Sequence, residues 1–132
     1  MKLKVTVLIF LLILGMFSVA QIPIVKASDE ELVLKHTLTN ATGWVSSVAF
    51  SQDGKWLASG SGGDNKVYIY RVSDWSLNQT LANATDGVRS VAFSQDNNWL
   101  ASSSMDSNVY IYRVSDWSLN QTLTDSTVGI DT

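Results

Sequence analysis

Short runs of alternating hydrophobic and polar residues, separated by turn residues, fill the chain after its first thirty positions. In the run "VYIYRV" (67–72), successive side chains point to opposite faces of an extended strand, and β-branched and aromatic residues dominate. Similar runs occupy 45–50, 56–61 and 77–81, with Gly-, Ser-, Asp- and Asn-rich stretches between them. The pattern predicts four short antiparallel strands joined by tight turns, with no helix beyond the N-terminal segment.

The pattern repeats once in full, with a period of 42 to 43 residues. The phrase "VYIYRVSDWSLNQTL" stands unchanged at 67–81 and at 109–123, which indicates a recent duplication. A fixed period is typical of repeat architectures, and unrelated strands of a sandwich would not produce it. The sequence therefore predicts an all-β fold of two four-stranded units, at about 44–81 and 88–123.

The first hairpin of each unit is recognisable in a second matching pair of segments. "VSSVAFSQDGKWLAS" at 45–59 corresponds to "VRSVAFSQDNNWLAS" at 88–102. Gly54 and Asn97 hold equivalent places in the turn between the two strands, and they are the residue types that best tolerate positive φ. We expect a tight turn at both places.

These segments resemble the repeats of the WD-repeat family. The stretch "VSSVAFSQDGKWLASGS" is similar to the family's first two strands, which often read "VxSVAFSPDG" and "LASGS". The stretches "DNKVYIYRV" and "DSNVYIYRV" resemble its third strand after a tight Asp turn. The resemblance runs from Leu32 to the C-terminus, and it implies β-propeller blades that act as a platform for binding other proteins.

The repeats depart from the family pattern at two motifs. The usual Gly-His pair is replaced around Ala41 and Ala84, and the usual Trp-Asp pair reads Tyr70-Arg71 and Tyr112-Arg113. In the family, that His and Trp share a buried hydrogen-bond network with a Ser or Thr and the turn Asp. The residues that match this network here, without the His, are Ser61, Asp64, Tyr70, Ser104, Asp106 and Tyr112. We expect each Asp to cap its own turn through backbone N–H groups instead.

Two units are fewer than the four to eight blades that usually close a propeller. The run 32–38 resembles an orphan fourth strand before the first unit, and "GID" (129–131) resembles the start of a third. These features predict an incomplete propeller. One interpretation is a truncated piece of a longer propeller, which the break inside a unit favours. In the other, identical chains complete a ring through heterologous contacts.

The N-terminal segment has the pattern of an export signal. Two lysines in "MKLK" precede an apolar run of 16 residues, which is too short for the roughly 18–20 residues that span a bilayer. Small residues follow at Ser18–Ala20 and at Val25–Ala27. Residues 1–27 are therefore interpreted as a signal peptide or, alternatively, as a retained membrane anchor, and residues 28–132 as the exported segment. The sequence predicts a secreted or extracytoplasmic protein, and contact with a membrane only through this segment.

The charge balance bears on the class of partner. Cleavage after Ala20 removes Lys2 and Lys4, which leaves seven Lys and Arg against twelve Asp and Glu, a net charge of −5. Phosphate binding depends on a high density of Lys and Arg, so nucleic acids and anionic membrane surfaces are disfavoured. There are no cysteines, so no disulfide framework accompanies the predicted export. A protein partner is the expectation.

Four Asn-x-Thr triplets are candidate N-glycan acceptors in an exported protein. They begin at Asn40, Asn78, Asn83 and Asn120.

Candidate catalytic chemistry is sparse in this sequence. His36 is the only histidine, and most aspartates hold repeated turn positions, such as Asp53 with Asp96. A catalytic pair of carboxylates would break the repeat symmetry, and these keep it. We therefore expect a non-enzymatic scaffold with no metal or other cofactor. The alternatives are a fragment of an extracellular propeller enzyme with its catalytic residues in other blades, or a truncated product without independent function.

Partner binding is expected at loop positions, and at three of them the two units differ. Propellers of this kind bind partners through the loops that enter the first strand and that join the second strand to the third. Trp and Arg, which occur in or beside these loops, are common interface anchors. The protein-binding candidates are Trp44, Asp64, Arg89 and Met105.

Overall fold

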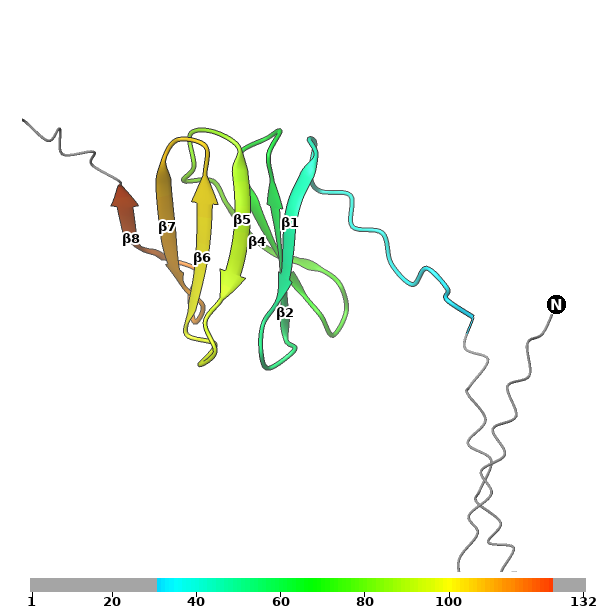
Figure 1. Cartoon of the computed structure of the whole chain (residues 1–132). Coiled ribbons are helices and arrows are strands. Elements are labelled where there is room, and N and C mark those ends of the chain that lie inside the picture. The colour runs from blue at the N-terminus through cyan, green and yellow to red at the C-terminus, as the bar shows by residue number, and fades with distance from the viewer. Residues whose placement is uncertain (1–30, 125–132) are drawn as a thin grey trace, which may run out of the picture. The chain divides into compact units, whose positions relative to one another are not determined.

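The computed structural model describes residues 31–124, and within them the chain forms eight β-strands and no helix (Figure 1). The strands of the first sheet are β1 (Val45–Phe50), β2 (Trp56–Ser61), β3 (Val67–Arg71) and β4 (Leu77–Leu81). Those of the second sheet are β5 (Val88–Phe93), β6 (Trp99–Ser104), β7 (Asn108–Arg113) and β8 (Leu119–Thr124). Each sheet is antiparallel and follows chain order, β1-β2-β3-β4 and β5-β6-β7-β8, which confirms the predicted all-β fold of two four-stranded blades.

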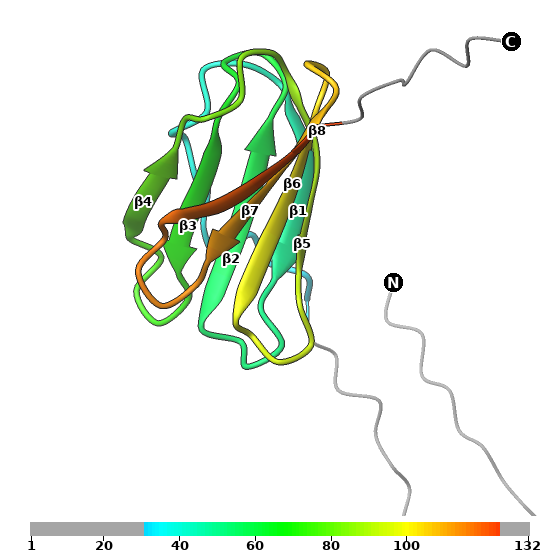
Figure 2. The same cartoon turned by 90° about the vertical axis from the view of Figure 1, so that its left-hand side faces the viewer.

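The two sheets pack face to face as neighbouring blades, and the described residues do not close a ring (Figure 2). The predicted signal segment 1–27 and the residues 129–131 lie outside the described part of the chain. Within residues 31–124, no helix is long and apolar enough to cross a membrane.

The first hairpin of each blade folds in the same way. Val48 pairs with Ser59 and Val91 with Ser102, and both hairpins carry a register shift near the start of the first strand. The φ angles of Gly54 (70°) and Asn97 (59°) are positive, as the residue types predict. Duplicated sequence has therefore given duplicated local structure.

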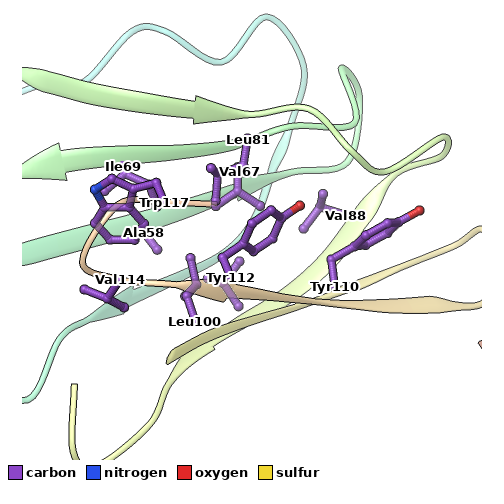
Figure 3. Packing of buried hydrophobic residues seen from close by; sticks show 11 residues of the cluster. Ala58, Val67, Ile69, Leu81, Val88, Leu100, Tyr110, Tyr112, Val114 and Trp117 are labelled. Carbon is purple, nitrogen blue, oxygen red and sulfur yellow. The ribbon is translucent and has the colours of Figure 1, made fainter. Parts of the chain in front are cut away.

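The core lies between the blades, because a sheet must bury its apolar face against another element. The first blade contributes Ala58, Val67, Ile69 and Leu81. The second blade contributes Val88, Val91, Leu100, Tyr110, Tyr112, Val114 and Trp117 (Figure 3).

Gly60 lets the two blades approach closely. A Cβ at this position would lie 2.7 Å from Val88 Cγ1 and 3.3 Å from Val91 Cγ1. Hydrogen bonds fix the same junction: the Ser46 hydroxyl donates to the Val88 carbonyl at 2.6 Å, and the Val91 N–H donates to Ser47 Oγ at 3.3 Å. The relative placement of the blades is thus set by packing and by hydrogen bonds together.

The prediction of an orphan strand at 32–38 is wrong, because residues 31–44 contain no strand. A fourth strand needs the free edge of a third strand. In the described part of the chain, β3 and β7 are already paired with β4 and β8. Leu38 and Ala41 instead pack against the buried cluster of Leu57, Tyr68 and Tyr70 on the outer face of the first blade.

The identical segments 67–81 and 109–123 offer a matched test of this packing. Ile69 is fully buried between the blades, whereas Ile111 holds the same place in the second blade and is only partly buried. We expect Ile69→Val to lower the free energy of unfolding by about 0.5–1.5 kcal/mol, and Ile111→Val to lower it by less than half as much. Urea denaturation at low protein concentration measures both changes. Equal losses at the two positions would contradict this packing.

Candidate functional site

A pocket of about 310 Å³ lies at the end of the sheets where β1 and β5 begin and β2 and β6 end. Its lining residues come from both blades. They are Trp44, Ser46, Gly62, Val88, Arg89 and Met105. The junction of the two blades thus forms a hollow with apolar, polar and charged walls.

Trp44 is held at this pocket by a glycine-rich loop. Its carbonyl accepts hydrogen bonds from the Gly62 N–H at 2.9 Å and from the Ser61 hydroxyl at 3.4 Å. The indole lies directly against Gly62, where any Cβ would overlap the ring nitrogen, and the backbones of Gly43 and Gly63 touch beside it. The side chain is nevertheless 67 % exposed, so its position is fixed while its surface stays available.

Met105 lines the pocket from the second blade, where the large residue and the glycine have exchanged places. The Met105 N–H donates to the Gly87 carbonyl at 2.9 Å, which matches the bond between Gly62 and Trp44 in the first blade. In the first blade the large residue precedes β1 and a glycine follows β2. In the second blade the glycine precedes β5 and the large residue follows β6. This exchange is why the two blades present different side chains to one pocket.

Arg89 supplies the charge of the pocket. Its side chain is exposed, and within residues 31–124 it makes no ion pair or hydrogen bond. Arg71 and Arg113 differ from it, because they pair with Asp74 and Asp116 at 3.4 Å. The Arg89 guanidinium therefore presents its donors to a ligand that would enter the pocket.

Asp64, the fourth predicted binding residue, does not line this pocket. One of its carboxylate oxygens accepts hydrogen bonds from the Thr42 N–H at 2.9 Å, the Thr42 hydroxyl at 3.1 Å and the Tyr68 hydroxyl at 2.7 Å. Asp106 repeats this arrangement with Thr85 and Tyr110, at 2.8, 3.1 and 2.7 Å. Both carboxylates are thus engaged in fastening the loop before a first strand to the turn before a third strand.

The hydrogen-bond partners of these aspartates differ from those expected from the family pattern. Tyr70 and Tyr112 are buried but form no hydrogen bond with either Asp, and Tyr68 and Tyr110, two residues earlier, do so instead. The expected turn cap is present at Asp106, whose second oxygen accepts from the Asn108 N–H at 3.0 Å. The second oxygen of Asp64 is buried without a partner.

The serines of the expected network also bond elsewhere. The Ser61 hydroxyl donates to the Trp44 carbonyl, and the Ser104 hydroxyl donates to the Asp86 carbonyl at 3.0 Å. The Asp106 N–H donates to Ser104 Oγ at 3.3 Å. Sequence reasoning missed Thr42, Thr85, Tyr68 and Tyr110. Their signal is the Asp-x-x-x-Tyr spacing with an upstream Thr, which occurs in both units.

The surroundings of these groups shift their pKa values. Burial alone would raise the pKa of Asp64. The nearby Ser61 hydroxyl and the hydrogen bonds from Thr42 and Tyr68 outweigh burial and hold the pKa well below its ordinary value of 3.8. At Asp106, burial is likewise outweighed by hydrogen bonds, chiefly from the Thr85 N–H and the Tyr110 hydroxyl, so its pKa is also lowered. Burial and the bond to Asp64 raise the pKa of Tyr68 to about 12.

Comparison with known proteins identifies the repeats. The family model "WD domain, G-beta repeat" matches residues 32–71 and 75–113, which is more than half of the chain. The chain belongs to the WD40 repeat family. Each match ends at the Arg that closes a third strand, Arg71 or Arg113, so each aligned repeat includes one of the Thr–Asp–Tyr networks.

Two solved structures similar to this WD40 chain support the assignment. "Structure of U3-55K" shares 30 % identity with a TM-score of 0.60, and the match covers 63 % of this chain and 25 % of that one. "Crystal structure of RRP9 WD40 repeats" shares 31 % identity with a TM-score of 0.58, over 61 % of this chain and 24 % of that one. The match therefore spans about a quarter of each of these structures. No curated protein matches the sequence.

The remaining candidate residues of the WD40 chain lie away from the pocket. The ring of His36 stacks on Trp75 with centroids 5.0 Å apart, and the described residues contain no cluster of His, Asp and Glu that could hold a metal. Asn40 and Asn83 are exposed in loops. Asn78 and Asn120 lie on β4 and β8, where their side-chain oxygens accept hydrogen bonds from Arg71 and Arg113. Glycosylation of the four asparagines stays a prediction.

The lowered pKa of Asp106 leads to a testable pH dependence. A folded-state pKa below 3.8 means that the ionised group stabilises the fold fully above about pH 5, and that this contribution is lost as the pH falls through the folded-state value. Asp106→Asn should lower the free energy of unfolding by about 1 kcal/mol at pH 7, and by progressively less toward pH 2. Urea denaturation between pH 2 and pH 7 measures the difference.

Asp86→Asn is the matched control, because it removes the same charge from an exposed neighbouring loop. It should not reproduce this pH dependence. Parallel stability curves for the wild type and Asp106→Asn across the whole range would contradict the role of the network.

Proposed function

We propose that the chain is an exported, non-enzymatic WD40 scaffold that binds a partner protein in the pocket at the junction of its two blades. One observation carries the proposal: Trp44, Arg89 and Met105, which break the repeat symmetry, all line that pocket. Duplicated positions serve the fold of both blades. The positions that differ between the blades gather in this pocket, so we assign the specific binding function to it.

The lining residues favour a particular class of partner. Trp44 and Met105 offer exposed apolar surface, at 67 % and 49 % exposure, on opposite sides of the blade junction. The Arg89 guanidinium, which lines the same pocket, can form charge-assisted hydrogen bonds with a carboxylate. Trp and Arg are also the side chains most often found as interface anchors. The partner we propose is an extended protein segment with an Asp or Glu next to a large apolar residue.

The chemistry of the titratable groups supports binding over catalysis. Asp64 and Asp106 have lowered pKa values, and one oxygen of each accepts three structural hydrogen bonds, which makes both carboxylates poor proton acceptors. His36 packs its ring against Trp75 and lies outside the pocket.

Selection of peptides from a random display library tests the binding site. The chain should enrich peptides in which an acidic residue neighbours an apolar one. Arg89→Ala and Trp44→Ala should each weaken the binding of such peptides about tenfold or more, because each removes an anchor. Isothermal titration calorimetry with the enriched peptides gives the dissociation constants.

Arg71→Ala is the matched control, because it removes an exposed arginine that is paired with Asp74 and lies outside the pocket. Its affinity for the peptides should equal that of the wild type. Peptides that bind Arg89→Ala and Trp44→Ala as tightly as the wild type would refute the proposed site.

Export makes a separate prediction about the N-terminus. Expression of the full chain in a secreting cell should release a product that begins at Gln21 or at Ser28, because small residues precede both positions. Intact-mass spectrometry of the medium and of the membrane fraction distinguishes the outcomes. A chain with all 132 residues in the membrane fraction would show that the segment is an anchor.

A further inference from the structure

We propose that a second copy of this chain docks onto the outer face of the first blade, so that copies associate head to tail through a contact that repeats the internal blade junction. Two surfaces take part, and both are defined by the internal contact. The leading face of a blade is the side that packs against the preceding blade. The trailing face is the side that packs against the following blade.

The internal junction shows what each face looks like when it is covered. On the leading face of the second blade, Val88 and Val91 are 1 % and 6 % exposed. On the trailing face of the first blade, Val67, Ile69 and Leu81 are 1 %, 0 % and 4 % exposed.

Equivalent residues at the two outer faces are exposed within the described structure. On the leading face of the first blade, Val45 and Val48 are 52 % and 61 % exposed. On the trailing face of the second blade, Leu123 is 45 % exposed, and Val109 and Ile111 are only partly buried. The chain therefore carries both halves of one interface, each with exposed apolar residues, and none of these residues is charged. Continuity with the internal junction argues for a second copy as the occupant, through a heterologous contact.

Residues 36–38 of the same chain cover part of the leading face of the first blade, and they do so with contacts like those of a neighbouring blade. At the internal junction, Trp56 of the first blade packs edge-on against Trp117 with ring centroids 5.3 Å apart. At the outer face of the first blade, Trp75, which corresponds to Trp117, instead stacks on His36 with ring centroids 5.0 Å apart. Leu38 likewise packs on Tyr68 and Tyr70, as Leu81 packs in the internal core. Residues 36–38 thus occupy the place of a neighbouring blade, and an incoming copy displaces them.

The second copy does not fit perfectly, and this gives the proposal a sharp test. Val88 and Val91 pack over Gly60, where even a Cβ would come within 2.7 Å of Val88. The second blade has Ser103 at the equivalent place. In the proposed contact, Ser103 of one copy faces Val45 and Val48 of the next. Ser103→Gly restores the close approach of the internal junction and should strengthen association about tenfold.

Sedimentation equilibrium of the full chain, as recovered and processed by the expressing cell, measures association over a range of concentrations. The wild type should show a mass that rises with concentration toward two to four copies, because four to eight blades close a propeller. Val48→Asp and Ser103→Glu should each remain monomeric, because each places a charge on one face. Gln52→Asp, in an exposed turn away from both faces, is the matched control and should associate like the wild type.

Mixing the two blocked variants isolates the head-to-tail geometry. Val48→Asp keeps an intact trailing face and Ser103→Glu keeps an intact leading face, so an equimolar mixture should form a one-to-one dimer and nothing larger. Circular dichroism of each variant checks that its β-structure is retained. A folded wild type that stays monomeric at all concentrations, or a mixture that forms no dimer, would overturn the proposal. Association that Val48→Asp leaves unchanged would overturn it as well, because the contact would then lie elsewhere.

Discussion

The packing of one four-stranded sheet against the next is the interaction on which the rest of this structure depends. A blade has two apolar faces, and neither four strands nor their hairpins can bury both of them alone. At the internal junction, Val91 and Leu100 are almost fully buried, and the Ser46 and Ser47 hydroxyls bond across to the next blade. The pocket exists because this junction places two different loop ends side by side.

Glycine placement decides what each blade presents at that junction. Gly60 admits Val88 and Val91, and Gly62 gives the indole of Trp44 a surface on which to lie. At the second blade, Gly87 and Met105 exchange the small and the large position. Exchange of a small and a large residue at these sites thus makes the pocket asymmetric, while the strands that support it stay the same.

The strands and the binding candidates were predictable from sequence to different degrees. Alternation along 67–72 and the positive-φ residue types at Gly54 and Asn97 report local backbone preferences, so the blades follow from them directly. Repeat asymmetry indicated Trp44, Arg89 and Met105, which the structure brings together. Its place in the loop between the second and third strands indicated Asp64 as well, but Asp64 bonds to Thr42 and Tyr68 instead. That outcome depends on where the loop before β1 lies, and no local preference reports this.

The Thr–Asp–Tyr networks explain how degenerate repeats keep the order of the family fold. No His occurs at 41–43 or 84–86, where the family has its Gly-His pair, so the turn Asp lacks that donor. The Thr N–H and hydroxyl groups and the Tyr hydroxyl supply three donors to one carboxylate oxygen in both blades. Charge-assisted bonds of this kind are about twice as strong as neutral ones, so they fasten the loop to the turn without the His. Because the loop before each first strand is tied down in this way, its neighbouring residues can differ between the blades without loosening them, and the binding pocket lies among those residues.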